Sequence, residues 1–275
     1  MPDDRLNEYL DTVELSGVTY GHIKEVKRFL TNYLAHLDYS IDKGKSLQYF
    51  KQIKENNSIS YYRKQLYQIL KFLTYLKIDW SKDIKPPADP IYYPKRISQE
   101  LIHETIRQLR GNNRFLQYKA MILLGTSSGM RPQEIYQLTT NDIDVKNRII
   151  YINHNPENGQ TTKTKKSRIT FITEQAQQAL SEYLTHFEND NTITTLFAQT
   201  SIKRVFLKIP LRVKDLRKFF SQEWDRRGGP TSIKKILMGH SLRNDVDLMH
   251  YNAQSPEDLK QIYDKVMGIL ILKDD

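Results

Sequence analysis

A tyrosine near the end of the chain follows a series of basic side chains whose types and order suit chemistry on a phosphodiester. A tyrosine hydroxyl has a pKa of about 10, so it attacks phosphorus only where cations stabilise the phenolate and the transition state. The sequence supplies such cations, and the candidate catalytic set is Arg131, Lys163, Lys214, Arg217, His240 and Tyr251. This set predicts nucleophilic attack on a phosphate without a metal ion or any other cofactor.

The first of these residues lies at a predicted junction between two helices. Gly129 is suited to end one helix and Pro132 to begin the next, so a phosphate beside Arg131 would meet a guanidinium and the positive end of a helix. Taken alone, the segment is more typical of a surface arginine, with Glu134 as an ordinary acidic residue of the first turn. The other members of the set decide in favour of a phosphate.

Three lysines lie in a predicted turn between two strands. A lysine on a hairpin can reach into a site and protonate a leaving alkoxide, while its neighbours hold the phosphate backbone. The lysines are Lys163, Lys165 and Lys166, and Arg168 follows them. Their spacing does not decide which lysine is catalytic, and a solvated lysine-rich hairpin is the alternative. DNA binding is predicted for Lys165, Lys166 and Arg168.

Lys214 and Arg217 are three residues apart in a helical pattern, so their side chains emerge on one face. Two neighbouring cations repel each other unless an anion lies between them or water screens them. A scissile phosphate is one explanation, and water or the nearby Asp215 is the other. Residues 203–235 contain eleven basic and three acidic residues, which favours contact with a DNA backbone.

His240 follows a glycine that ends a short predicted helix, so it is expected in the turn after that helix. There its imidazole would hydrogen-bond a phosphate oxygen, although a histidine in this place commonly binds a backbone carbonyl. Tyr251 is one of 17 tyrosines, so its value comes from its position after the basic residues.

The composition favours a polyanionic partner, with nucleic acid ahead of an acidic membrane surface. Lys plus Arg number 42 against 32 Asp plus Glu, a net charge of +10. The absence of cysteine excludes disulfides, thiolate catalysis and cysteine-ligated zinc. The polar start and the lack of a long apolar run predict a cytoplasmic protein with no signal peptide and no membrane partner.

Two domains are expected. Four prolines in residues 82–96 favour an extended linker, placed at residues 85–96. Apolar periodicity before it predicts a small helical DNA-binding domain at residues 1–84. Two helices are expected there, one marked by apolar residues between Ile23 and Leu37 and one by those between Leu66 and Leu76. The second carries Arg63, Lys64 and Lys71 on its exposed side, and these residues are assigned to DNA binding.

Residues 97–275 form the predicted catalytic domain, which is mainly α with a small antiparallel sheet. Ser98 is suited to cap a helix that ends near Leu109, and Ser255 to cap the last helix. The remaining expected elements are strands at 143–153 and 167–173 and helices at 116–124, 174–187, 213–224 and 232–238.

Taken in order, these motifs resemble the tyrosine recombinase (phage-type integrase) family over most of the chain. The segments similar to its first-arginine box, hairpin lysine and Leu-Gly-His box are Gly129-Met130-Arg131-Pro132-Gln133-Glu134, Thr162-Lys163-Thr164 and Leu237-Met238-Gly239-His240-Ser241. Lys214 stands where most members have histidine, as in integrases of archaeal viruses and plasmids, and the chain also resembles Xer-like recombinases. The gap between His240 and Tyr251 is longer than usual, which leaves Tyr263 as an alternative nucleophile.

The resemblance implies a site-specific recombinase of a mobile element that acts on double-stranded DNA. Tyr251 would attack phosphorus to give a 3′-phosphotyrosyl enzyme and a free 5′-hydroxyl, while Arg131, Arg217 and His240 stabilise the charge. Lys163 would protonate the leaving oxygen, and Lys214 would add positive charge or take the tyrosine proton. The resemblance further implies a monomer when free and a homotetramer on paired sites. The apolar stripe of a terminal helix at residues 255–270 would serve this assembly, or the helix would fold back on its own domain.

Other functions have weaker support. Lys43-Gly44-Lys45-Ser46 ends like a phosphate-binding loop but lacks its first glycine and a βαβ context. Asp142 and Asp144 would suit a magnesium nuclease, although a turn before a strand explains them better. A non-catalytic DNA-binding regulator or accessory protein on the same fold, and a type IB topoisomerase, remain the alternatives.

Overall fold

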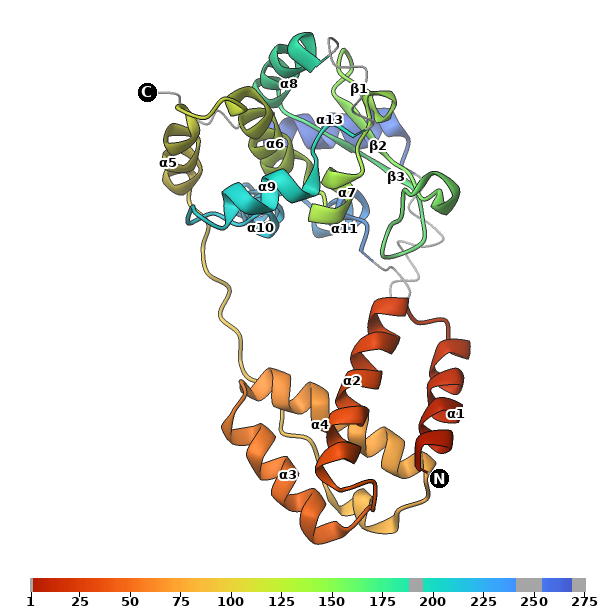
Figure 1. Cartoon of the computed structure of the whole chain (residues 1–275). Coiled ribbons are helices and arrows are strands. Elements are labelled where there is room, and N and C mark those ends of the chain that lie inside the picture. The colour runs from red at the N-terminus through yellow and green to blue at the C-terminus, as the bar shows by residue number, and fades with distance from the viewer. Residues whose placement is uncertain (1, 188–194, 241–253, 269–275) are drawn as a thin grey trace. The chain divides into compact units, whose positions relative to one another are not determined.

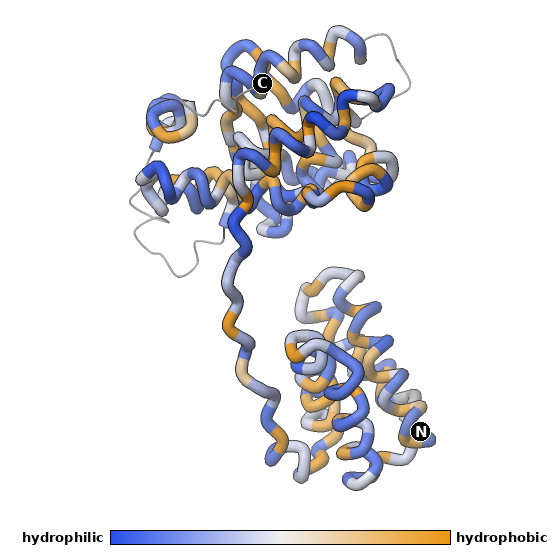
Figure 2. The backbone as a smooth tube through the Cα atoms, turned by 90° about the vertical axis from the view of Figure 1, so that its left-hand side faces the viewer, coloured by the Kyte–Doolittle hydropathy of each residue, from blue (hydrophilic) through white to orange (hydrophobic). Residues whose placement is uncertain are grey.

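The computed structural model describes residues 2–187, 195–240 and 254–268 (Figure 1). The chain divides into two compact units, Met1–Pro94 and Lys95–Asp275. Each unit has its own cluster of buried hydrophobic residues. Hydrophobic and hydrophilic stretches alternate along the helices of both units, as expected where each helix buries one face (Figure 2).

Apart from its connecting turns and residues 84–94, the described part of the first unit is helical. Its helices are α1 (Pro2–Leu15), α2 (Tyr20–His36), α3 (Lys43–Glu55), α4 (Ile59–Tyr75) and the short 3₁₀ helix η1 (Asp79–Asp83). The side chains of Thr19, Asp42 and Ser58 accept backbone N–H groups at the starts of α2, α3 and α4. Buried tyrosine, phenylalanine and leucine side chains from all four α-helices form the core.

The segment that ends like a phosphate-binding loop is the first turn of α3. Asp42 caps this helix by accepting the Lys45 N–H at 2.8 Å. The Ser46 hydroxyl is buried and bonded to the hydroxyl of Tyr33 at 2.7 Å. Because α3 follows a helix and not a strand, the segment has no phosphate-loop geometry.

The second unit is built around α6, which contacts α5, α8, α10 and β3 (Figure 1). Its helices and strands are α5 (Gln99–Leu109), α6 (Phe115–Ser128), α7 (Pro132–Tyr136), η2 (Thr140–Asp142), β1 (Ile143–Asp144), β2 (Ile149–Ile152), η3 (Pro156–Asn158), β3 (Arg168–Phe171), α8 (Glu174–Phe187), α9 (Gln199–Phe206), α10 (Val213–Arg226), α11 (Thr231–Met238) and α13 (Pro256–Met267). Gly125 lets α6 and α10 approach closely, since a Cβ there would lie 2.7 Å from Cδ1 of Leu216.

The sheet has the order β1-β2-β3, and both pairs are antiparallel. Ile150 pairs with Thr170, and Ile152 pairs with Arg168. The single strand expected at residues 143–153 is in fact two strands. A turn separates them because the Asp144 carboxylate binds the backbone and side-chain nitrogens of Asn147 at 2.9 and 2.7 Å.

The predicted fold class is confirmed: a mainly helical chain with a small antiparallel sheet. Several predicted helix ends are also confirmed. Ser98 accepts the Leu101 N–H at the start of α5, Gly129 ends α6 with φ 66°, and Ser255 begins α13 with Asp258 as its capping partner.

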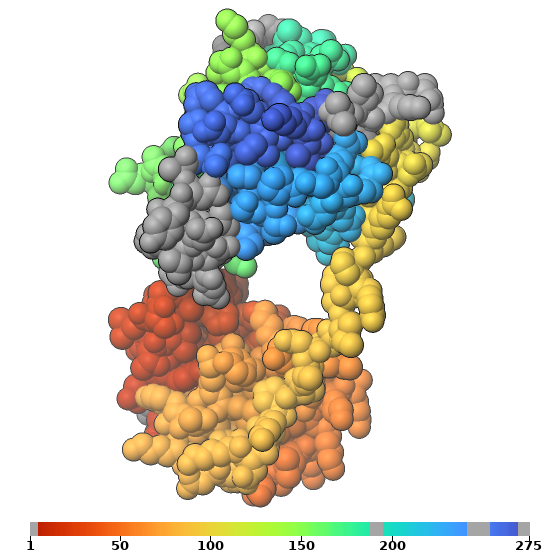
Figure 3. Space-filling view, turned by 180° about the vertical axis from the view of Figure 1, so that it is seen from behind, coloured from red at the N-terminus to blue at the C-terminus, as the bar shows by residue number. Residues whose placement is uncertain are grey.

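The last described helix, α13, packs against its own unit. It contacts α10 and β3, and it lies beside α10 and α11 on the surface of the unit (Figure 3). Its apolar stripe, which we expected to serve assembly, is buried there through Leu259, Tyr263, Val266 and Met267. This stripe is therefore core in the described structure, because it completes the hydrophobic cluster of the second unit.

Candidate active site

Arg131 stands at the start of α7, as the helix junction predicted. Its backbone N–H donates to Oε2 of Glu134 at 2.7 Å, and its Nη1 donates to Oε1 of the same carboxylate at 2.9 Å. Its Nη2 donates to the carbonyl of Gly239 at 2.7 Å. The guanidinium is thus fixed between α7 and the end of α11, with one fifth of the side chain exposed.

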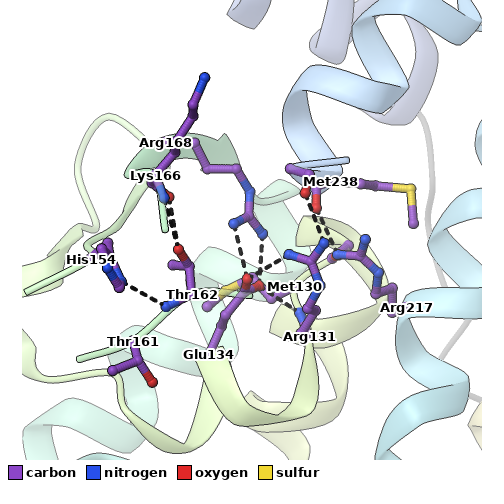
Figure 4. A network of polar contacts seen from close by, with 12 residues as sticks. Met130, Arg131, Glu134, His154, Thr161, Thr162, Lys166, Arg168, Arg217 and Met238 are labelled. Carbon is purple, nitrogen blue, oxygen red and sulfur yellow. Dashed lines mark hydrogen bonds and ion pairs between the residues drawn. The ribbon is translucent and has the colours of Figure 1, made fainter. Parts of the chain in front are cut away.

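Glu134 is a buried carboxylate at the centre of these contacts. Its side chain is 2% exposed, and it is bound by Arg131 and by a two-pronged contact from Arg168 (Figure 4). Burial alone would raise the pKa of Glu134, but the hydrogen bonds and charges of Arg168 and Arg131 hold it below its ordinary value. Glu134 is therefore an ionised structural anion and not an ordinary first-turn acid.

Arg217 reaches the same place from α10. Its Nη1 donates to the carbonyls of Gly129 and Met238 at 2.7 and 2.9 Å (Figure 4). Burial first, and then the charge of Arg131, lowers the pKa of Arg217 to about 10. The side chain is consequently still a cation at neutral pH. We use the name arginine cluster for Arg131, Arg168 and Arg217 around Glu134.

His240 directly follows the end of α11 and is brought to the arginine cluster. Gly239 takes the left-handed conformation with φ 64°, and the His240 N–H donates to the Lys235 carbonyl at 3.0 Å. Desolvation of the ring, followed by the charges of Arg217 and Arg131, lowers the pKa of His240. The imidazole is thus neutral at neutral pH, with a donor and an acceptor nitrogen.

The three hairpin lysines lie at a tight turn whose base is anchored. The Lys165 N–H donates to the Thr162 carbonyl at 3.1 Å, and the Thr162 hydroxyl bonds the backbone of Lys166. The Thr162 N–H donates to Nδ1 of His154 at 3.1 Å (Figure 4). Lys163, Lys165 and Lys166 are all exposed. We use the name lysine turn for residues 162–166.

Lys214 lies on the exposed side of α10, one turn before Arg217. Asp215, the anion that offered an alternative explanation, caps the start of α10 and pairs with Lys218 at 3.1 Å. Among the described residues, Lys214 has no ion-pair partner within 4.0 Å.

The candidate catalytic residues all lie within one stretch of the chain that matches a known family. Residues 95–262, which include every candidate catalytic residue, match the phage integrase family. The chain belongs to the phage integrase family. No curated protein matches it in sequence.

Solved integrases and a recombinase have the same fold as this phage integrase family member. The Tn1549 transposon integrase, in complex with transposon right end DNA, is 15% identical with a TM-score of 0.65, over 94% of this chain and 97% of that one. The lambda integrase dimer bound to a COC' core site is 11% identical with a TM-score of 0.65, over 96% and 95%. The XerH recombinase bound to difH is 18% identical with a TM-score of 0.53, over 78% and 68%.

The nucleophile predicted for this family member, Tyr251, lies outside the described residues. The alternative, Tyr263, is described and is unsuitable. Its side chain is fully buried, and its hydroxyl donates to the Ser127 carbonyl at 2.9 Å. Burial raises the pKa of Tyr263 far above that of an exposed tyrosine, so the ring cannot supply a phenolate to a phosphate.

Most residues assigned to DNA binding are placed on the surface, but Arg168 is not. In the first unit, Arg63 contacts the Pro87 carbonyl and Asp89, Lys64 pairs with Glu25, and the Lys71 ammonium lies over the ring of Tyr67. The side chain of Arg168 is 9% exposed and is fully engaged inside the arginine cluster. It is therefore not available to a DNA backbone.

The proposed magnesium ligands have other roles in the structure. The Asp142 carboxylate is buried and accepts hydrogen bonds from Thr139, Asn153 and Gln160, so it ties the sheet to the hairpin. Asp144 makes the turn between β1 and β2. Among residues 2–187, 195–240 and 254–268, no group of acidic or histidine side chains is arranged to hold a metal ion.

No helix of this part of the chain is long and apolar enough to cross a membrane.

Proposed function

We propose that this chain is a site-specific DNA recombinase of a mobile element, which cuts and rejoins strands through a covalent 3′-phosphotyrosyl link to Tyr251. The observation that supports this most directly is the meeting of Arg131, Arg217 and His240 at the end of α11. Two fixed guanidinium groups beside a neutral imidazole suit the charge of a pentacoordinate phosphorane.

In the proposed reaction the Tyr251 oxygen bonds to phosphorus as the bond to the 5′-oxygen breaks. Lys163 gives its proton to that oxygen, so a 5′-hydroxyl leaves. The tyrosine proton passes to water or to Lys214, which otherwise acts as a positive charge near the phosphate. Attack by the 5′-hydroxyl of a partner strand reverses the step and exchanges the strands. The phosphotyrosyl link conserves the bond energy, so the reaction needs no nucleotide.

The proposal also covers organisation and partners. Residues 1–84 would bind DNA, residues 85–96 would be a linker, and residues 97–275 would carry the chemistry. The partner would be double-stranded DNA inside the cell, bound by a monomer that forms a homotetramer on paired sites. Lys214 in place of the usual histidine supports a relation to integrases of archaeal viruses and plasmids.

Two alternative functions make different predictions. A non-catalytic DNA-binding regulator would form no covalent adduct, and it would have no need of the ordered cationic residues seen here. A type IB topoisomerase would form the adduct on many sequences and would relax any supercoiled plasmid. A recombinase would form it only at its own sites.

The test begins with selection of bound sequences from a random duplex library. Nicked duplexes that carry these sequences trap the adduct. After cleavage, the short fragment that bears the free 5′-hydroxyl diffuses away and cannot reverse the reaction. We expect a covalent adduct on Tyr251 that forms in EDTA, and none with Tyr251→Phe, which keeps its DNA affinity. Tyr151→Phe, which alters an exposed tyrosine of β2, is the matched control.

Three results would contradict the proposal. They are an adduct of normal yield in Tyr251→Phe, a requirement for magnesium, and equal relaxation of plasmids with and without the selected sequence.

A further inference from the structure

Arg168, the first residue of β3, points into the unit and not toward solvent. Its Nη1 and Nη2 donate to the two carboxylate oxygens of Glu134 at 3.0 and 2.7 Å (Figure 4). Its Nε donates to the Leu237 carbonyl at 2.9 Å. This is the two-pronged geometry in which an arginine holds a carboxylate most firmly. Arg168 therefore links the sheet to α7 and to the end of α11.

The charges around Glu134 explain why a second arginine matters. One carboxylate serves both Arg131 and Arg168, and Arg217 adds a third positive charge nearby. With Arg168 present, Arg131 makes a single side-chain contact with Glu134 and directs its Nη2 to Gly239. Without Arg168, both carboxylate oxygens would be free to bind Arg131, which would neutralise its charge and turn it away from a phosphate.

The turn that carries His240 depends on the same residues. Three consecutive carbonyls, of Leu237, Met238 and Gly239, accept hydrogen bonds from Arg168, Arg217 and Arg131 in that order. A Cβ at Gly239 would lie 2.8 Å from the guanidinium of Arg168. Arg168 thus packs directly against the residue before His240.

We propose that Arg168 is a positioning residue: it occupies Glu134 and fixes the turn at residues 237–240, which leaves Arg131 and His240 free for the scissile phosphate. Strand β3 begins at Arg168, two residues after the end of the lysine turn. The contacts of Arg168 therefore also fix the end of β3 to which the lysine turn is attached. The proposal rests on the function proposed above and adds a residue that would not touch DNA.

The test compares Arg168→Gln with Arg148→Gln. Arg148 is a suitable control because it is a partly buried arginine in the turn before β2, bonded to Asp264 at 2.9 Å and without a contact in the arginine cluster. Single-turnover adduct formation at saturating protein is measured together with DNA affinity and thermal unfolding. We expect Arg168→Gln to lower the rate constant by about 10-fold or more, less than loss of a group that binds the phosphate itself, with DNA affinity unchanged. Arg148→Gln should keep the normal rate constant.

A double variant separates positioning from mere folding. If Arg168 acts by occupying Glu134, Arg168→Gln with Glu134→Gln should cleave faster than Arg168→Gln alone, since no carboxylate remains to neutralise Arg131. Arg168→Lys should restore part of the rate. An equal loss of rate in the Arg148 and Arg168 variants, or no recovery in the double variant, would overturn the proposal.

A second measurement does not depend on cleavage. In the free protein, NMR titration of the His240 ring should show a higher pKa in Arg168→Gln, because a nearby cation is gone and the turn is released, and no change in Arg148→Gln. A protein that forms no adduct but shows this shift would refute the proposed function and keep the positioning role. An unchanged His240 titration would refute the positioning role whatever the adduct assay shows.

Discussion

The arginine cluster and the lysine turn carry the same sign of charge but hold it in opposite ways. In the cluster, each guanidinium is bound by carbonyls or by Glu134, so its position is set before any ligand arrives. In the lysine turn, only the base is bonded, through Thr162 and His154, and the lysine side chains extend into solvent. In the proposed reaction, this difference would give a fixed binding site for the phosphate and a separate, adaptable donor of protons.

The largest expected effect comes from the lysine turn. We compare alanine variants of Lys163, Lys165 and Lys166. Only Lys163→Ala should lower single-turnover cleavage by about 10²- to 10⁴-fold, the usual effect of losing a general acid. A substrate with sulfur in place of the leaving 5′-oxygen should restore the rate, because a thiolate leaves without a proton. The exposed Lys146 in the neighbouring turn provides the control. Similar small losses at all three lysines would remove the distinction between the two regions.

The next effect concerns the arginine cluster. Arg217→Gln should lower the cleavage rate at saturating protein by about 10²- to 10³-fold, as for the loss of a donor to a transition-state oxyanion, and the sulfur substrate should not rescue it. Stopped-flow or quench kinetics with both substrates measure this contrast. Rescue by sulfur would mean that Arg217 assists the leaving group and belongs functionally with the lysine turn.

Lys214 lies between the two regions in character, since it is on a fixed helix but is exposed. We expect Lys214→Ala to lose about 10-fold in cleavage, in line with an exposed charge worth about 1 kcal/mol, and Lys214→Arg to lose less. If Lys214→Arg is as inactive as Lys214→Ala and Lys214→His recovers activity, Lys214 moves a proton.

The smallest effect is on the pH dependence of stability. The pKa of His240 is depressed in the folded state, so its contribution to stability is complete above the unfolded pKa and declines as pH falls through the folded value. Between pH 7.5 and pH 5.5, the wild-type protein should therefore lose more unfolding free energy than His240→Gln. Urea unfolding at both pH values measures the difference, and equal losses would argue against desolvation of the ring.

The sequence predicted best those features that depend on neighbouring residues. Caps such as Ser98 and Ser255, and the glycine end of α6, follow from local backbone chemistry. Helices α1 and α3 were not predicted because their apolar positions show only a weak period, so their stability comes from tertiary packing. Helix α9 was missed because it is only eight residues long.

The sequence did not reveal the roles of Glu134 and Arg168. These residues are 34 positions apart and meet only when β3 pairs with β2 and the sheet packs beside α7 and α11. Arg168 looked like one more cation after the hairpin lysines. The two-residue period of a strand would have placed Arg168 and Thr170 on the exposed face, opposite Ile169 and Phe171, whereas Thr170 is fully buried in the structure.

Gly125 takes no part in the hydrogen bonds of the arginine cluster, yet the position of Arg217 depends on it. Any side chain there would press on Leu216 and force α10 outward, and Arg217 would move with the helix. A relative could keep each catalytic residue and still be inactive if it lacked this close approach of α6 and α10. Surveys that grade such proteins by their reactive residues alone would count that relative as an active enzyme.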